Sequence, residues 1–432
     1  MTISPAMFEA LMKPFDPLCQ EGPVAVAFSG GPDSTALAFC LQHYLSCRLV
    51  ALLVEHGLRP ESKEEAEKAA KASRDQGIET FILPWHHDPL QGRLHVKARQ
   101  ARYALLFEAC RARGIKTLFL AHHADDQAET VLMRFAKGSG VDGLSGMPAI
   151  ARRQGITLAR PFLDIPKETL VETCRHHGLF YVIDPSNEKE QYARGRLRKI
   201  MPLLAQEGLS RASLLDMAAR AREASQALDF YARDFLRKAA QADQYGGVFL
   251  ELSNLRGLPL AVAGRVVRLV MDDMHKKNYA PPRSKAEPFL RWLRDPDEKG
   301  VKTWQGCLIK KGEQCDRALF VRERMAIKTR PVLKRGQSLR FDECWQITWP
   351  QEVEIGAFQA LTLAPLGHPP HALLDRLAPD LRKTCLQAYV RASLPALWDG
   401  DELASIPAFV EEKPPEGYSH VFAYRRMPSW LQ

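Results

Sequence analysis

Three patterns that define common kinds of site are missing from this sequence. None of its nine cysteines forms a C-x-x-C pair, so the spacing encodes neither a zinc ribbon nor a cysteine-held cluster. No stretch matches the nucleotide-binding pattern G-x-x-x-x-G-K-S/T. No apolar run is long enough to span a membrane, and no apolar signal core follows a basic N-terminus. We therefore expect a cytoplasmic protein that has reduced cysteines and no membrane contact.

The size and charge of the chain indicate how many domains it has and what kind of partner it binds. Its 432 residues are too many for one ordinary domain, and we expect two or three. The formal net charge is +9. A charge of this sign favours a polyanionic partner such as nucleic acid, although the charge alone is equally typical of a basic enzyme without such a partner.

One stretch combines a strand, a glycine turn and a helix. The short apolar run Val24–Phe28 predicts a buried strand, and the residues after Ser34 have helical spacing. Between them lies Ser29-Gly30-Gly31-Pro32-Asp33-Ser34, which we call the phosphate loop. Its glycines let the backbone approach an anion closely, and the N–H groups that open the helix point at that anion. A glycine turn without a ligand is the plainer interpretation, but six particular residues in this context favour phosphate binding.

Asp33 is the unusual member of the phosphate loop. Phosphate oxygens repel a carboxylate unless a cation lies between them. The residue therefore indicates a Mg²⁺ ion that bridges Asp33 and a polyphosphate.

Strands and helices alternate through the first half of the sequence. We predict strands over 24–28, 49–54, 80–83, 117–121 and 157–161, and helices over 61–76, 94–113 and 167–177. This alternation predicts an α/β fold, a Rossmann-like parallel sheet with helices on both faces. Ligands of such sheets bind at the carboxyl ends of the strands. The phosphate loop and the polar turns at 55–59 and 122–130 follow three strands, so we expect them to form one site.

The pattern of apolar and polar residues changes at two places, near residue 208 and near residue 328. Residues 209–328 have helical periodicity and predict a small α-rich domain, whereas short β-type runs in 329–432 predict an α+β C-terminal domain. We therefore divide the chain into domains over 1–208, 209–328 and 329–432. The glycine-rich stretch 137–147 is either a flexible lid or a surface connection.

Two clusters of charged residues suggest chemistry. In His122-x-x-x-Asp126-x-x-Glu129 the two carboxylates share one face of a helix near its start, where they can hold Mg²⁺ or orient an amine. Acids that simply favour the helix dipole are the alternative explanation. The run from Arg194 to Lys199 carries four cations, which form either a solvated helix face or a patch that contacts phosphates.

Together these motifs resemble the tRNA(Ile)-lysidine synthetases, a bacterial family of PP-loop ATP pyrophosphatases. The resemblance covers about the first 205 residues in the family's order, with a further short match near the end. The matching segments are 29–34, 54–59, 98–99 with 102–103, 122–130, 138–140, 184–187 and 399–403. Two positions depart from the family pattern: Glu55 stands where the family usually has Asp, and Gly195 stands where it usually has Asn.

The resemblance implies an enzyme that binds ATP, L-lysine and the tRNA(Ile) whose CAU anticodon begins with cytidine. It implies that the cytidine is adenylated with release of pyrophosphate, and that the lysine amine then expels AMP. It implies a monomer or a homodimer, with tRNA contacts in the last two domains. It assigns ATP to the phosphate loop and His56; Mg²⁺ to Asp33 and Asp126; lysine to Asp126 and Glu129; tRNA to Arg194, Arg196 and Arg198; and catalysis to Asp33, Arg102, Asp126 and Glu129.

Other readings of the same loop remain open. A PP-loop tRNA thiolase of the cluster-dependent kind would carry paired cysteines, which this chain lacks. An amidotransferase-type synthetase would need a glutaminase domain, and no room for one precedes residue 24. A non-catalytic RNA-binding protein would have no need of the complete phosphate loop or of the acidic cluster.

Overall fold

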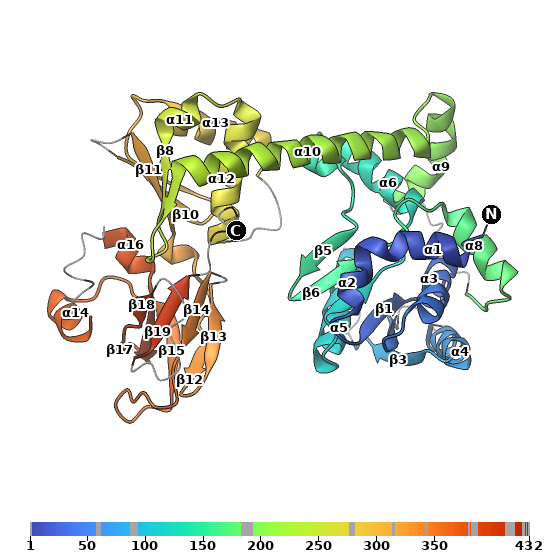
Figure 1. Ribbon diagram of the computed structural model, residues 1–432, viewed down its shortest axis with the longest axis horizontal. Coiled ribbons are helices and arrows are strands. Elements are labelled where there is room, and N and C mark those ends of the chain that lie inside the picture. Colours follow the sequence, from blue (N-terminus) through green and yellow to red (C-terminus); the bar gives the residue numbers. More distant parts are fainter. Residues whose placement is uncertain are drawn as a thin grey trace. The chain divides into compact units, whose positions relative to one another are not determined.

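Figure 1 shows the computed structural model, in which the chain forms two compact units, Met1–Ser225 and Gln226–Gln432. The structure describes residues 2–57, 62–86, 94–182, 193–275, 281–312, 316–342, 344–378, 381, 388–410, 420–425, 428 and 430. Within these residues, no helix is both long enough and apolar enough to cross a membrane.

A six-stranded sheet forms the centre of the first unit, in the order β3-β2-β1-β4-β6-β5. Its strands are β1 (Val24–Phe28), β2 (Leu49–Glu55), β3 (Glu79–Pro84), β4 (Thr117–Phe119), β5 (Ile150–Arg153) and β6 (Ile156–Ala159). Five of them run parallel, whereas the edge strand β5 pairs antiparallel with β6. The predicted α/β fold is confirmed, and β5 is an addition that the alternating pattern did not predict.

The helices of the first unit include those predicted over 61–76, 94–113 and 167–177, whose bounds differ by at most one residue from the predicted ones. They are α1 (Pro5–Met12), α2 (Asp16–Cys19), α3 (Pro32–Tyr44), α4 (Ser62–Asp75), α5 (Leu94–Ala112), α6 (Ala124–Phe135), α7 (Val141–Leu144), α8 (Lys167–His176), α9 (Ala193–Gln206) and α10 (Arg211–Ala239), which continues past Ser225 into the second unit. A 3-10 turn, Lys13–Phe15, joins α1 to α2.

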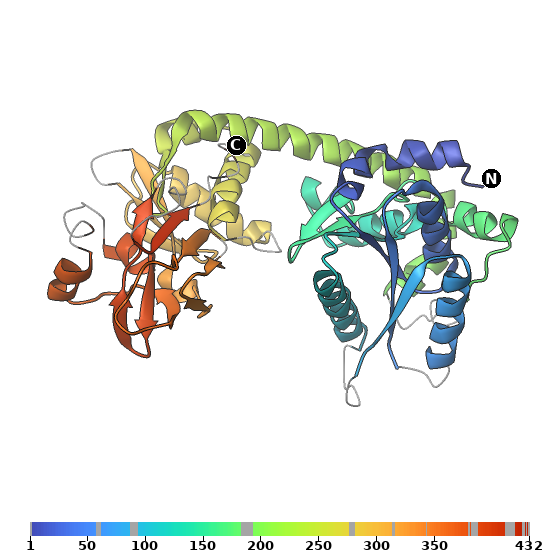
Figure 2. The ribbon, with the colours of Figure 1, turned by 60° about the horizontal axis from the view of Figure 1, so that its bottom comes forward.

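Helices cover both faces of the sheet because successive residues of β1 point to opposite sides. Val26 and its neighbours on one face pack with α1, α3, α4 and α8 into one core. Ala25 and Ala27 on the other face pack with α5 into a second core. Figure 2 shows α4 and α5 on opposite sides of the sheet. A smaller third core, which includes Val131 and Leu214, holds α6 and α9 against the start of α10.

The second unit contains a sheet where we predicted an α-rich domain. Five antiparallel strands pair in the order β7-β8-β11-β10-β9. The strands are β7 (Ala240–Ala242), β8 (Val248–Glu251), β9 (Val301–Trp304), β10 (Cys307–Lys311) and β11 (Arg317–Arg322), and the helices beside them are α11 (Leu252–Arg256), α12 (Leu260–Met274) and α13 (Arg283–Arg294).

The strands of this sheet are short, and the long helices α10 and α12 dominate the periodicity of the region, which explains why the sheet was missed. The strands β10 and β11 end in buried cations, Lys311 and Arg322. Lys311 Nζ donates to the carbonyl oxygens of Trp292 and Asp295. Arg322 forms a buried ion pair with Asp342, with Nε 2.7 Å from Oδ2. Each cation is therefore satisfied inside the unit, as burial requires.

Two four-stranded sheets complete the second unit and share one core. One pairs β12 (Val332–Lys334), β15 (Ala360–Pro365), β16 (Pro395–Asp399) and β17 (Glu402–Ser405); the other pairs β13 (Ser338–Phe341), β14 (Trp345–Thr348), β19 (Phe422–Arg425) and β18 (Ala408–Val410). The helices α14 (His371–Leu377) and α16 (Ala388–Ser393) connect their strands. The β-type runs near 338, 345 and 360 are confirmed as strands, while the division into three domains stays a prediction.

Candidate active site

The phosphate loop lies at the carboxyl end of β1 and opens α3. Gly31 is the N-cap of α3 and offers no side chain to bond the first N–H groups of the helix. Those groups are therefore directed toward an external acceptor, which is the geometry that binds anions. The Ser34 hydroxyl ties the loop together, because its Oγ accepts from Ser29 N at 3.1 Å and donates to Gly31 O at 3.0 Å.

Gly30 is the position where the loop requires glycine. Its φ is +75°, and a Cβ atom there would lie 2.7 Å from the Cβ of Ala69 in α4. Its carbonyl oxygen accepts a hydrogen bond of 2.8 Å from Val182 N, which secures the loop from the other side. The loop is therefore held in a shape that a larger residue would disrupt.

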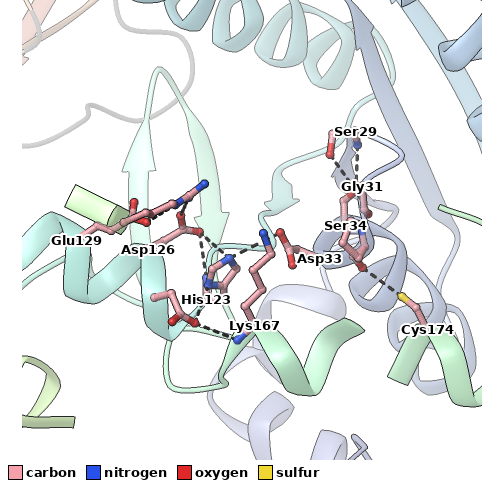
Figure 3. A network of polar contacts seen from close by, with 12 residues as sticks. Ser29, Gly31, Asp33, Ser34, His123, Asp126, Glu129, Lys167 and Cys174 are labelled. Carbon is pink, nitrogen blue, oxygen red and sulfur yellow. Dashed lines mark hydrogen bonds and ion pairs between the residues drawn. The ribbon is translucent and has the colours of Figure 1, made fainter. Parts of the chain in front are cut away.

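A second group of polar residues begins where β4 ends. His123 is the N-cap of α6, and its backbone N–H donates to Asp126 Oδ2 at 3.3 Å. Its ring points toward the phosphate loop, where Nε2 lies 3.6 Å from Asp33 Oδ2 and 3.5 Å from Asp126 Oδ2 (Figure 3). The other ring nitrogen, Nδ1, lies 3.5 Å from Asp125 Oδ2. Three carboxylates thus surround one buried imidazole.

These carboxylates keep His123 charged. Burial by itself would lower the pKa of His123, but its polar contacts with Asp125 and Asp33 and the charge of Asp126 outweigh burial and raise the pKa to about 9. The neighbouring His122 behaves oppositely, because burial and three nearby arginines lower its pKa to about 3. At neutral pH, His123 is an imidazolium that partly balances the charge of these three carboxylates, and His122 is neutral.

Sequence reasoning chose His122 for this cluster, whereas the structure places His123 there. Both histidines precede the same helix, so spacing cannot decide between them. The available signal is the helix start: the N-cap residue begins the first turn and faces the sheet edge, and His123 occupies that position.

Glu129 is buried and is paired with an arginine from a distant helix. Arg198 Nε in α9 lies 2.5 Å from Glu129 Oε1, and its Nη2 lies 3.9 Å from Asp126 Oδ1. Burial would lower the pKa of Arg198, but the hydrogen bond and charge of Glu129 raise it. We predicted Arg198 as a tRNA contact; its guanidinium instead faces the acidic cluster. Arg196 is exposed on α9, and the side chain of Arg194 is outside the described residues.

Other predicted residues lie at the same edge or outside the described part of the chain. Arg102 in α5 has a pKa that burial lowers, and Arg99 stacks over Tyr103 with its Cζ 5.3 Å from the ring centre. His56 follows β2 and meets the edge of the Trp85 ring. The segments 58–59 and 184–187 are outside the described residues, so their predicted roles stay predictions.

The glycine-rich stretch after α6 is fixed by two side chains that sequence reasoning missed. Gln127 is buried; its Nε2 donates to Met147 O at 2.9 Å, and its Oε1 accepts from Met147 N at 2.7 Å. Arg134 donates to the carbonyl oxygens of Gly143 and Gly146. These bonds favour a held surface connection over a flexible lid.

The residues present fit Mg²⁺ at Asp33 better than at Asp126. Asp33 Oδ1 is buried and has no hydrogen-bond partner within the described chain, so it suits a cation held mainly by phosphates and water. Asp126 instead has cationic groups of His123 and Arg198 beside its oxygens. Among the described residues, no group of three or more His, Cys, Asp or Glu side chains is arranged to hold a metal by itself.

A parallel sheet with Ser-Gly-Gly-Pro-Asp-Ser at the carboxyl end of its central strand defines a PP-loop protein, a class that uses ATP. A family model described as "PP-loop domain" matches residues 4–204. The tRNA(Ile)-lysidine synthase of Ruegeria pomeroyi is 33% identical over 387 residues, 89% of this chain and 88% of that protein. The protein of the same name from Methylobacterium nodulans is 43% identical over 61% of this chain and 78% of its own. The chain belongs to the tRNA(Ile)-lysidine synthase family.

Proposed function

We propose that this protein joins L-lysine to the wobble cytidine in the CAU anticodon of tRNA(Ile). ATP drives the reaction and leaves as AMP and pyrophosphate. Membership of the family supports the substrate, and one observation carries the chemistry. Asp33 of the phosphate loop and Asp126 in the first turn of α6 lie on the same side of the His123 ring, within 3.6 Å of its Nε2. The triphosphate site and the acidic cluster are therefore neighbours.

The phosphate loop suits the first step. Its free N–H groups stabilise the charge that grows on pyrophosphate as the cytidine oxygen displaces it, while the Ser34 hydroxyl holds the loop in shape through Gly31 O. Mg²⁺ beside Asp33 would neutralise the triphosphate when it is bound. His56 follows β2, the strand beside β1, and we assign it to the binding of ATP. Arg102 stabilises the negative phosphate of the adenylated cytidine.

The acidic cluster suits the second step. The lysine substrate carries ammonium groups, and Asp126 and Glu129 supply carboxylates at the sheet edge. One of them accepts the proton that the amine loses as it attacks the cytidine carbon and expels AMP. Arg198 balances Glu129 before lysine arrives, because a buried carboxylate without a partner is costly.

Binding of the tRNA requires cations at the surface. Arg196 is exposed on α9, and we assign it with Arg194 to the phosphate backbone. The assignment of Arg198 to tRNA stays a prediction that requires it to leave Glu129. We propose that the reaction takes place in the cytoplasm and that the protein acts as a monomer or a homodimer.

Labelled lysine gives the direct test. The protein is incubated with ATP, labelled lysine and total tRNA, and the labelled tRNA is then identified. We expect label only in the tRNA(Ile) with the CAU anticodon, with equal amounts of AMP and pyrophosphate. Transfer of sulfur instead of lysine would indicate a thiolase, and tRNA binding without ATP cleavage would indicate a non-catalytic protein.

A further inference from the structure

Arg211 is the first residue of α10, the helix that continues from the first unit into the second. Its guanidinium has two carboxylate partners. Nη1 lies 3.0 Å from Asp125 Oδ1, while Nη1 and Nη2 lie 3.0 and 2.8 Å from the two oxygens of Glu168. The two partners differ in exposure, because the Glu168 side chain is 66% exposed and the Asp125 side chain is 35% exposed.

Asp125 links Arg211 to His123 at the start of α6. Its second oxygen, Oδ2, accepts from the backbone N–H of Lys167 at 3.0 Å and lies 3.5 Å from His123 Nδ1. The opposite ring nitrogen of His123 faces Asp33 at 3.6 Å. Arg211 and Asp125 share a hydrogen bond, while Asp125, His123 and Asp33 are joined by ion-pair contacts of 3.5 and 3.6 Å. The four residues therefore form one line of charged contacts from the start of α10 to the phosphate loop.

We propose that Arg211 is a positioning residue for the reaction, a role that rests on the proposed function. Arg211 fixes the carboxylate plane of Asp125, and Asp125 fixes the ring plane of His123. The ring plane decides whether Nε2 meets Asp33 and Asp126 together. Because misplacement by a fraction of an ångström slows a reaction that depends on alignment, the loss of Arg211 lowers kcat rather than substrate affinity.

Arg211 also ties the start of α10 to the first turn of α6, which contains Asp125. The same helix supplies residues to the core of the second unit, among them Leu236. The residue that begins this helix is thus in direct contact with the acidic network of the first unit.

The outer contact provides a matched control. The pair with Glu168 is a surface ion pair, and such pairs contribute little to stability. Glu168→Gln removes the charge of the outer ion pair and leaves the contact between Arg211 and Asp125 in place. If Arg211 merely anchored α10, the loss of either ion pair would change kcat to a similar extent. If Arg211 is a positioning residue, kcat depends on the contact with Asp125.

The experiment measures kcat and KM for lysidine formation in the full-length protein and in Arg211→Ala, Arg211→Lys and Glu168→Gln. We expect Arg211→Ala to lower kcat about tenfold or more, with KM values for ATP and lysine changed less than about twofold. Arg211→Lys should recover most of the rate, and Glu168→Gln should keep it within about twofold of the wild-type protein. Equal rates for Arg211→Ala and Glu168→Gln would overturn the proposal.

A double-mutant cycle separates positioning from stability. Asp125→Asn alone and together with Arg211→Ala should reduce kcat to the same extent, because both changes break one line of contacts. Independent, multiplicative losses would overturn the proposal even if both variants melt at lower temperature. A wild-type protein that transfers no lysine would instead refute the proposed function, so the two failures are distinguishable.

Discussion

The Nε2 atom of His123 lies 3.6 Å from Oδ2 of Asp33, so the turn after β4 touches the phosphate loop directly. The two residues are far apart in the sequence, and the parallel pairing of β1 with β4 brings them together. A cationic imidazole therefore stands between the phosphate loop and the carboxylates that we assign to lysine.

Asp33→Asn should abolish the reaction while tRNA binding survives. The amide keeps the size of the side chain but loses the charge that pairs with His123 and that would face a metal. We expect AMP formation to fall at least about 100-fold, as measured by the release of pyrophosphate and AMP. Asp75→Asn, an exposed change at the end of α4, is the control and should leave the rate unaltered. Turnover by Asp33→Asn at the wild-type rate would remove Asp33 from the mechanism.

Gly30→Ala should damage the first unit more than Gly138→Ala. Both glycines have φ near +70°, so alanine at either costs roughly 1–2 kcal/mol of backbone strain. Only at position 30 does the new Cβ also meet another atom, the Cβ of Ala69 at 2.7 Å. Overpacking of this kind adds roughly 1–3 kcal/mol. Urea unfolding of the two variants measures the difference, and equal stabilities would show that the loop can move away from α4.

Glu129→Gln should weaken the binding of lysine and leave ATP binding unchanged. The amide removes the charge that attracts an ammonium group and reduces the ion pair with Arg198 to a hydrogen bond with a neutral acceptor. Because a hydrogen bond to a charged group is worth roughly 1.5–3 kcal/mol, we expect KM for lysine to rise about tenfold or more. KM for ATP should stay within about twofold, since the phosphate loop is intact.

The control is Glu172→Gln, because Glu172 is also paired with an arginine but lies on the surface of α8. A rise in KM for ATP that matches the rise for lysine would contradict the separate roles of the two clusters.

The buried cysteines should resist alkylation in the folded protein. Burial is the main cause that raises the pKa of Cys40, Cys110 and Cys174 to about 12, from an ordinary value of 9.0. At pH 8 an ordinary thiol is roughly one-tenth thiolate, whereas these are about one part in 10,000. Iodoacetamide labelling followed by mass spectrometry should find them unmodified until urea unfolds the chain. Rapid labelling of Cys174, whose Sγ donates to Pro32 O, would instead indicate a reactive thiol beside the phosphate loop.

Much of the first unit could be predicted because its signals are local. The phosphate loop is a contiguous run, and α4 and α5 have helical spacing that ends at glycine, so their bounds agree with the predicted ones within one or two residues. The strands of the second unit near 307 and 317 were not predicted, because they are short and the longer helices α10, α12 and α13 dominate the pattern over 209–328.

The details of the candidate site depend on contacts between distant residues. Glu129 and Arg198 are 69 residues apart, and Asp125 and Arg211 are 86 apart. No spacing rule joins such pairs, and Arg198 in a basic run resembles a surface cation. The choice between His122 and His123 likewise depends on which residue opens α6, and a boundary shift of one residue reverses it.

A crystal structure with a non-hydrolysable ATP analogue tests the central claim most directly. We predict that the β- and γ-phosphates lie on the backbone N–H groups that open α3, with Asp33 and His123 beside them. A triphosphate bound in the second unit, with the phosphate loop of the same crystal unoccupied, would contradict the account.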